Sequence, residues 1–280
     1  MPDLERLEKL PRPATPGRFA GWDRWWLLFV VVGVLVVAMT VLWPDPYQRI
    51  VLFMTDGIVV TIKTTVISYL CILIVGLIAG LGRISKNVAV RGVASVYVEV
   101  VRGIPLLVQL MFIYYASPAL VQGLGRSLLQ GAPALHDLGQ SMANFSIDPQ
   151  IGAIFGLTFC YGAYVGEIYR AGIESIPKGQ MEAARSLGMS YVQAMRYVIL
   201  PQAIRTILPP LGNEFVALLK DSSLVSVVAV ADMTRRGREF MSSHFNPLET
   251  WTMVALLYLL LTVFAARIVS YIERRSSYVR

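Results

Sequence analysis

The chain has 280 residues and a formal net charge of +7, yet 55% of its residues are hydrophobic and only 15% are charged. Soluble domains carry about 25% charged residues, so this composition excludes an ordinary soluble domain and indicates an integral membrane protein. The positive balance is explained by basic residues at membrane boundaries and by contact with lipid head groups. It does not indicate a nucleic-acid partner.

Crossing a bilayer requires about 20 mostly apolar residues. Four segments meet this requirement without any charged residue, at residues 25–43, 64–82, 149–166 and 250–266. Two further segments, 93–116 and 203–230, are apolar but include charged residues and prolines. The sequence therefore predicts an all-α integral membrane protein with six transmembrane helices.

The first span is followed by Trp43-Pro44-Asp45-Pro46 where a cleavable signal peptide would have small residues, so we interpret it as an uncleaved anchor. Cys71 and Cys160 lie inside predicted spans, where packing is a better explanation than a disulfide. No metal-ligand spacing occurs, so we expect no metal site. His136 and His244 fall in outer loops and are interpreted as solvated.

Basic residues favour the cytoplasmic side of a membrane. In a six-span chain, four basic groups share one side: Arg6, Lys9, Arg12, Arg18 and Arg24; Arg83, Lys86 and Arg91; Lys178, Arg185 and Arg196; Arg274, Arg275 and Arg280. The opposite side carries Arg49, Arg126 and one discordant cluster, Arg235, Arg236 and Arg238. We therefore expect both termini and the loop 176–201 to be cytoplasmic.

That loop contains the most informative stretch, Glu182-Ala183-Ala184-Arg185-Ser186-Leu187-Gly188. Its first residues favour a helix, and Gly188 suits the left-handed residue that ends one. Ser190 and Gln193 fit a capping box that starts a second helix, which we expect to end near Leu200-Pro201. Two short helices would meet at a glycine elbow, and an alanine-faced helix of this kind fits a cleft on a partner. The alternative is an ordinary cytosolic helical loop.

The stretch resembles the EAA loop of binding-protein-dependent ABC importer permeases. Glu182-Ala183-Ala184, Gly188 and Leu200-Pro201 stand at the family's spacing, with Val198 where the pattern has Ile. The similarity extends over residues 57–273, and its details resemble the polar amino acid branch, of the histidine/glutamine permease type. Segments similar to that branch occur at residues 57–65, 99–110, 163–180, 200–203, 209–213 and 219–224. The chain departs from it by an extra N-terminal tail and span (1–56) and a longer outer loop (117–149).

The resemblance implies a permease subunit of an ATP-driven amino acid importer in the bacterial inner membrane. It also implies four parts, namely a basic cytoplasmic tail, an extra helix with an outer loop, the permease domain and a cytoplasmic tail, at residues 1–24, 25–56, 57–273 and 274–280. Expected partners are a second permease subunit, cytosolic ATPases, an extracytoplasmic solute-binding protein, the amino acid and membrane lipid. Coupling to the ATPase is expected at Gly179, Glu182, Ala183, Ala184 and Gly188.

No segment of the form G-x-x-x-x-G-K-[ST] occurs, so the chain is expected to be no enzyme and to hold no cofactor. ATP and Mg²⁺ would be bound by the partner ATPase.

Three other functional classes are the alternatives to an importer permease. A secondary transporter would show internal repeats, a channel would need a filter loop, and an intramembrane enzyme would need paired catalytic residues within its spans. A non-ABC channel or secondary transporter subunit is the remaining alternative.

Charges inside a membrane are expensive and are usually functional. Glu167 has two interpretations: a pathway carboxylate that meets a substrate amino group, or the partner of Arg170 in an ion pair that fixes the helix. Glu99 and Arg102 stand three residues apart and are predicted to pair with each other. Pro105 is predicted to kink their helix.

The fifth predicted span is the most irregular, because Pro209-Pro210 is expected to break its helix and Lys220-Asp221-Ser222-Ser223 interrupts its apolar run. Broken helices line cavities in transporters. Pathway or gate candidates are therefore Asn213, Glu214, Lys220 and Asp221. The alternative is a buried Lys220/Asp221 cluster that closes a subunit interface. In the outer loop, the segment Leu120 to Gln130 is predicted to lie on the membrane surface and touch the binding protein.

Overall fold

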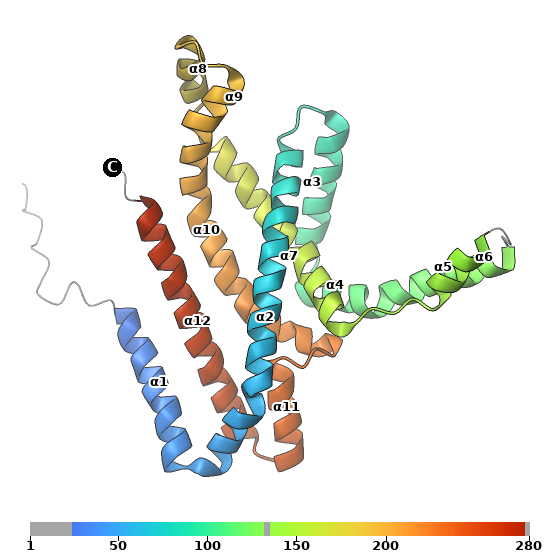
Figure 1. The fold of residues 1–280 in the computed structure, drawn as a ribbon, viewed down its shortest axis with the longest axis vertical. Helices are drawn as coiled ribbons and strands as arrows, with labels where there is room; N and C mark the ends of the chain where they lie inside the picture. The colour runs from blue at the N-terminus through green and yellow to red at the C-terminus, as the bar shows by residue number, and fades with distance from the viewer. Residues whose placement is uncertain (1–23, 132–134, 278–280) are drawn as a thin grey trace, which may run out of the picture.

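The computed structural model describes residues 24–131 and 135–277, and within these ranges every regular element is a helix (Figure 1). The basic residues predicted in the N-terminal tail up to Arg18, and Arg280, lie outside the described residues. Four helical segments are long and apolar enough to cross a membrane, Pro44–Arg83, Leu106–Gly131, Pro149–Glu174 and Pro247–Arg275. A shorter apolar helix spans Trp26–Leu42. The prediction of an all-helical membrane protein is confirmed.

The first helix lies at the edge of the molecule and runs antiparallel to the second (Figure 1). Helix α1 (Arg24–Leu42) packs against α12 (Pro247–Ser277) and α2 (Pro44–Arg83), and the rings of Phe29 and Phe264 lie 6.1 Å apart. Asp45, near the start of α2, has non-helical dihedral angles, so the continuous part of this helix begins at Pro46. At 1.5 Å per residue, residues 46–83 extend about 57 Å, well beyond the roughly 30 Å core of a bilayer. Most of the segment 44–56, expected to be an outer loop, is helical. Ile50 and Met54, both fully buried, hold this extension in an apolar cluster with residues of α11 and α12.

The centre of the fold is the contact between α2 and α7 (Pro149–Glu174). Glycines allow this contact: a Cβ on Gly80 would lie 2.7 Å from the carbonyl oxygen of Gly166, and one on Gly76 would lie 2.5 Å from a methyl of Val165. Without a strong hydrophobic driving force between helices in lipid, small residues at the contact are what allow two backbones to pack closely. Any side chain at Gly80 would push α7 away from α2.

The segment predicted as one kinked helix, 93–116, is instead broken. Helix α3 (Val88–Gly103) ends before Ile104 and Pro105, which are extended, and α4 (Leu106–Met111) starts anew before the π-helical turn η2 (Phe112–Ala116). The side-chain amide of buried Gln109 donates to the carbonyl oxygens of Val101 and Ile104, each at 2.7 Å, and so satisfies the backbone at the break. A proline alone predicts a kink, whereas this glutamine makes a full break tolerable.

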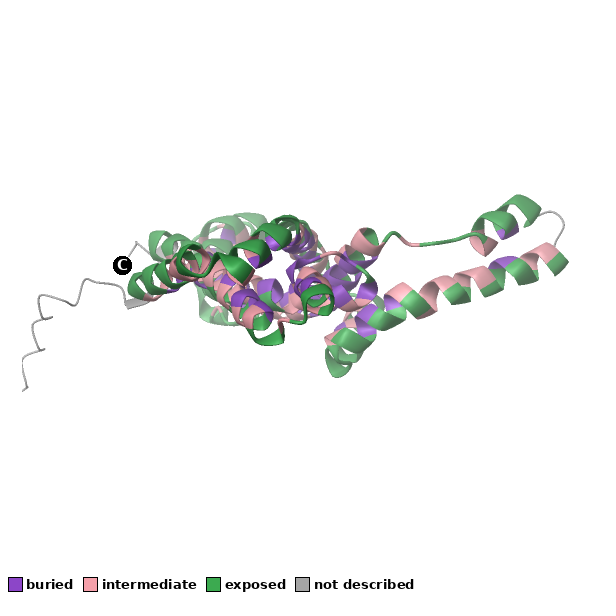
Figure 2. Ribbon diagram, turned by 90° about the horizontal axis from the view of Figure 1, so that it is seen from below, coloured by how far each residue is buried: buried purple, intermediate pink, exposed green. Residues whose placement is uncertain are grey.

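The loop 117–149, predicted to be an outer loop, contains a helical hairpin. Helices α5 (Ser117–Gly131) and α6 (His136–Ala143) pack against each other and project sideways from the bundle (Figures 1 and 2). The hairpin is attached through η2, and Gln122 donates a hydrogen bond of 2.8 Å to the carbonyl of Phe145 in the return segment.

After α7 the chain forms two short helices, α8 (Lys178–Ser186) and α9 (Tyr191–Ala194), and continues through the π-helical turn η4 (Met195–Ile199) into α10 (Leu200–Asp221). The predicted end near Leu200-Pro201 is wrong, because the chain stays helical from η4 into α10 and Pro201 lies within this continuous run.

The predicted break at Pro209-Pro210 is also wrong, since α10 stays helical through both. The two prolines leave the carbonyls of Arg205 and Thr206 without helical donors. Both of those residues are exposed, while Ile207 and Leu211 on the other side of the helix are buried in the core. Packing of the apolar face therefore keeps the helix intact.

Beyond Asp221 the helix tightens into the 3₁₀ turn η5 (Ser222–Val228), as the interruption at Lys220–Ser223 predicted, and ends at Ala229 in the left-handed conformation. Helix α11 (Met233–His244) follows and carries the discordant arginines. Arg236 pairs with Asp56 and, at 2.8 Å, with Glu239, which also accepts from Arg235 at 3.0 Å. Local acids thus neutralise much of the charge of this cluster.

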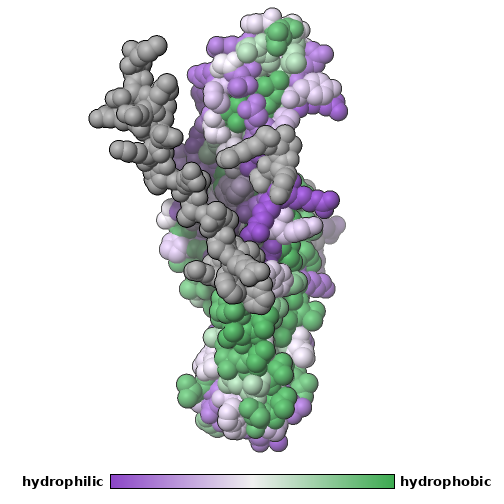
Figure 3. All heavy atoms as spheres, turned by 90° about the vertical axis from the view of Figure 1, so that its left-hand side faces the viewer, coloured by the Kyte–Doolittle hydropathy of each residue, from purple (hydrophilic) through white to green (hydrophobic). Residues whose placement is uncertain are grey.

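Apolar surface is concentrated on part of the molecule. On the side of α1 and α12, Figure 3 shows a broad apolar zone over the lower half and polar surface above it. This distribution fits helices that are bounded by lipid over part of their length.

Candidate coupling elbow and transport path

The loop between α7 and α10 is a helical elbow whose geometry was predicted from its sequence. Gly188 has φ +84°, the left-handed conformation expected of it. The N–H of Met189 donates to the carbonyl of Ala184 at 3.2 Å, and that of Gly188 donates to Arg185 at 3.0 Å. This pair of bonds is the Schellman ending of a helix, in which a glycine avoids the steric penalty of positive φ.

The second arm of the elbow begins with the predicted capping box. The backbone N–H of Ser190 donates to the Gln193 side chain at 2.8 Å, and the N–H of Gln193 donates to the Ser190 hydroxyl at 3.2 Å. Because α9, η4 and α10 are continuous, the elbow sits directly on the end of a long helix. A force on α8 would therefore reach α10 through a short rigid connection.

The elbow occupies one extreme end of the molecule (Figure 1). Of the predicted coupling residues, Gly179, Glu182, Ala183 and Gly188 are exposed, whereas Ala184 faces inward and is buried. Large apolar side chains around the bend are also exposed: Leu187 by 81%, Val192 by 71% and Tyr191 by 59%. Such surface is unfavourable in water.

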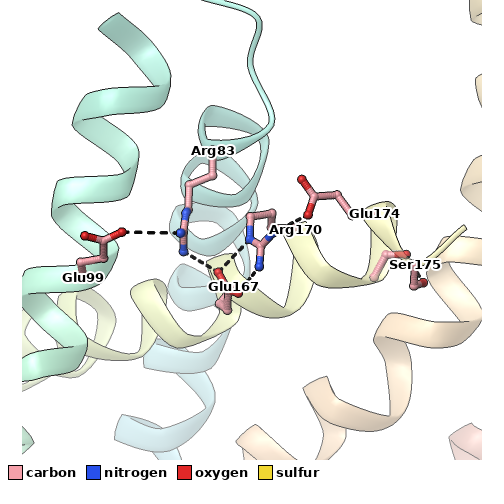
Figure 4. Close-up of polar contacts among 7 residues, drawn as sticks. Arg83, Glu99, Glu167, Arg170, Glu174 and Ser175 are labelled. Atoms are coloured by element: carbon pink, nitrogen blue, oxygen red, sulfur yellow. Dashed lines mark hydrogen bonds and ion pairs between the residues drawn. The ribbon is translucent and has the colours of Figure 1, made fainter. Parts of the chain in front are cut away.

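Glu167 lies at the centre of an ion-pair network that joins three helices (Figure 4). Its carboxylate accepts from Arg83 at the end of α2 and from Arg170 one turn along α7, with the Arg170 Nε at 3.0 Å. Arg170 also pairs with Glu174. The ion pair required by the structural interpretation of Glu167 is therefore present.

The predicted pairing of Glu99 with Arg102 is wrong. Glu99 faces Arg83 at 3.9 Å, while the guanidinium of Arg102 lies over the ring of Tyr164, 5.4 Å from its centre. The side chain that pairs with Glu99 in place of Arg102 is Arg83 of α2. Spacing within α3 cannot reveal a partner on another helix. In the sequence, Arg83 indicates topology. Its position at the end of an apolar run also allows its long side chain to reach the membrane interface and form an ion pair there.

Helix α10 carries the other pathway candidates on two stripes. Glu214 and Asp221 are half-buried and stand seven residues apart, so they lie on one face, two turns from each other. Asn213 and Lys220 repeat this spacing on the neighbouring, exposed face. None of the four belongs to the Glu167 network, so the structure separates the predicted set into two groups.

One residue that the sequence analysis missed is Tyr161 of α7. Its hydroxyl donates to the Asp221 carboxylate at 2.7 Å. The ring of Tyr161 lies 6.0 Å from that of Tyr164, over which the guanidinium of Arg102 is placed, so Arg102 belongs to the same region. The region thus combines two carboxylates, a guanidinium and a phenol, donors and acceptors suited to an ammonium and a carboxylate group. A tyrosine within an apolar run carries no spacing signal that would have identified it.

Asp232 caps the start of α11. Its carboxylate accepts from the N–H groups of Thr234 and Arg235 at 3.1 and 3.0 Å and from the Tyr258 hydroxyl at 3.2 Å. Burial raises the pKa of Asp232, although these hydrogen bonds oppose the shift. Since the N–H of Met233 also donates to Thr61 of α2 at 3.1 Å, this cap joins α2, α11 and α12.

Known proteins are similar to this chain in sequence and in fold. The family described as binding-protein-dependent transport system inner membrane component matches residues 72–278. The glutamine transport system permease protein GlnP of Escherichia coli K12 is 39% identical over 220 residues, covering 79% of this chain and 91% of that protein. The L-cystine transport system permease protein TcyB of Bacillus subtilis 168 is 35% identical over 242 residues, covering 86% and 94%.

Among solved structures, an amino acid ABC transporter with histidines aligns with a TM-score of 0.68 and 37% identity, covering 81% of this chain and 96% of that chain. The MetNI methionine ABC transporter, in an inward-facing conformation, aligns with a TM-score of 0.62 at 19% identity and supports the fold alone. The chain belongs to the family of binding-protein-dependent ABC importer permeases, as its EAA loop indicated. It is a multi-pass inner-membrane subunit, and ATP hydrolysis belongs to a separate subunit.

Proposed function

We propose that this permease forms the translocation path of an importer for polar amino acids and couples it to a partner ATPase through the elbow. The amino acid class is supported by relatives named for glutamine, cystine and arginine transport. In this proposal the chain crosses the membrane six times, through α1, α2, α3 with α4, α7, α10 and α12. An even number of crossings leaves both termini on one side, and their basic residues favour the cytoplasm.

The observation that carries the coupling proposal is the exposed elbow. Leu187, Tyr191 and Val192 surround a bend whose glycine holds it in one geometry, at one end of the molecule. A cleft on the ATPase would cover this apolar surface, with Gly179, Glu182 and Ala183 on the exposed side of α8. Magnesium and ATP would then be held by the partner. The remaining partners are a second permease, identical or homologous, and an extracytoplasmic binding protein.

We further propose that substrate passes beside the polar stripes of α10. Glu214 and Asp221 offer carboxylates to an α-ammonium group, and Arg102 offers a guanidinium to an α-carboxylate. Leaving such groups unpaired in a low dielectric is costly, which favours a zwitterionic ligand. Glu167 is assigned to the ion-pair network that holds α2, α3 and α7 together, because two arginines already occupy its carboxylate.

Purification with associated subunits tests the function as a whole. The complex is reconstituted with its binding protein, and ATPase activity is measured against a panel of amino acids. We expect stimulation by a subset of polar amino acids. Failure of any amino acid to stimulate ATPase activity or uptake, in a complex that contains all its subunits, would contradict the proposal.

A pair of variants tests the path at Asp221. If Asp221 binds substrate, Asp221→Asn should lose uptake, while Tyr161→Phe, which removes the 2.7 Å hydrogen bond, should retain most of it. If Asp221 instead closes an interface, both variants should lower the yield of assembled complex alike. Glu214→Gln provides the parallel test for the second carboxylate, with basal ATPase activity as the control for assembly.

A further inference from the structure

The hairpin of α5 and α6 has two chemically different faces. The two helices cross closely, because a Cβ on Gly125 would lie 2.4 Å from the backbone nitrogen of Ala143 and 2.7 Å from the carbonyl oxygen of Gly139. This contact fixes the rotation of each helix about its axis. The side chains that point away from the contact are therefore held on defined sides of the hairpin.

One side of the hairpin is apolar. With Gly125 and Gly139 facing each other, the 100° turn per residue places Leu120 and Leu124 of α5 on the same side as Leu138 of α6. Their exposed fractions are 59%, 60% and 51%, so nothing in the described chain covers them. Three large, exposed apolar side chains therefore share one side of a small hairpin.

The other side is polar. The same geometry places Gln122 and Arg126 of α5 together with His136 and Gln140 of α6. From residue 117 to 147, Arg126 and Asp137 are the only residues with a full charge, so the hairpin offers few groups for a charge-based contact with a protein. An interfacial helix has this division, with apolar residues on one side and polar residues on the other.

The attachment of the hairpin favours lipid as the occupant of the apolar face. Helix α5 continues from α4 and η2 within a single apolar segment, Leu106–Gly131, that is long enough to enter a bilayer. From there the hairpin runs across the direction of the long helices (Figures 1 and 2). A segment that leaves a membrane-embedded helix and runs across the bundle remains at the depth where that helix ends.

We propose that the α5–α6 hairpin lies on the bilayer surface, with Leu120, Leu124 and Leu138 in the lipid and Gln122, Arg126 and Gln140 towards water. The hairpin would then brace the permease against tilting in the membrane. Its assignment to the outer leaflet rests on the proposed topology, whereas contact with lipid does not. A binding protein covering the same leucines is the competing occupant.

Spin labels test this placement in the full permease. Single cysteines replace Leu124 and Leu138 on one face, and Arg126 and Gln140 on the other, in a background with Cys71→Ala and Cys160→Ala. Each labelled complex is placed in nanodiscs of phosphatidylethanolamine and phosphatidylglycerol. Relaxation by oxygen, which concentrates in lipid, is compared with relaxation by nickel-EDDA, which stays in water.

We expect the ratio of oxygen to nickel relaxation to be several-fold higher at Leu124 and Leu138 than at Arg126 and Gln140, with or without binding protein. Equal ratios on the two faces would overturn the proposal. So would nickel accessibility at Leu124 that disappears only when binding protein is added, since that result would identify a protein as the occupant. Neither result depends on transport, so failure here is separable from failure of the proposed function.

Discussion

The Glu167→Gln substitution separates the two interpretations of the membrane carboxylate. It leaves the side-chain volume almost unchanged but removes the negative charge shared by Arg83 and Arg170. All three side chains are partly buried: the exposed fraction is 23% for Glu167, 16% for Arg83 and 27% for Arg170. Two guanidinium groups would then face each other without a counter-ion between them.

The size of the effect follows from this partial burial. Removing one partner of a fully buried pair costs about 3–5 kcal/mol, whereas an exposed pair contributes about 0–1 kcal/mol. A pair that is about a quarter exposed falls between these limits, so we expect a loss of roughly 2–3 kcal/mol. For a chain of this size, that corresponds to a fall of about 4–12 °C in the midpoint of thermal unfolding.

The assay compares thermal unfolding of the purified complex with uptake in proteoliposomes. Glu99→Gln is the matched control, because Glu99 faces the same Arg83 but lies 3.9 Å away with its side chain 73% exposed. It should lower stability by less than about 1 kcal/mol. For Glu167→Gln we expect uptake to fall in proportion to assembled complex, with substrate preference unchanged. An unaltered unfolding midpoint combined with lost uptake would refute this reasoning and return Glu167 to the transport path.

Three further predictions concern the elbow, the topology and the Asp232 cap of α11. Gly188→Val should strain the left-handed bend and loosen or uncouple the ATPase, and full transport at normal complex yield would contradict this. Impermeant thiol reagents should label a cysteine at Ser141 but not one at Ser186 in intact cells lacking the native cysteines, and the reverse pattern would overturn the topology. Asp232→Ala should lower stability by about 1–2 kcal/mol through loss of a helix cap, measured by thermal unfolding, and an unchanged midpoint would show that the cap is dispensable.

Local chemistry was enough to predict the elbow. Gly188 was predicted to be left-handed because helices often end at a left-handed residue that is usually glycine, and the capping box needed only Ser190 and Gln193 three residues apart. Both features depend on residues close in sequence, so no knowledge of the remaining fold was required. The apolar segments likewise identified a helical membrane protein, since in lipid the backbone must satisfy its own hydrogen bonds.

Only the tertiary structure decided how charged and irregular residues are used. Glu99 pairs with Arg83 rather than Arg102, because α2 brings a guanidinium beside α3. Pro209 and Pro210 do not break α10, because packing of Ile207 and Leu211 outweighs two lost hydrogen bonds. The extension of α2 through residues 44–56 depends on a cluster with α11 and α12, some 200 residues later in the chain. Sequence spacing determines contacts within one helix, whereas these contacts join helices whose approach is set by the packing of the whole bundle.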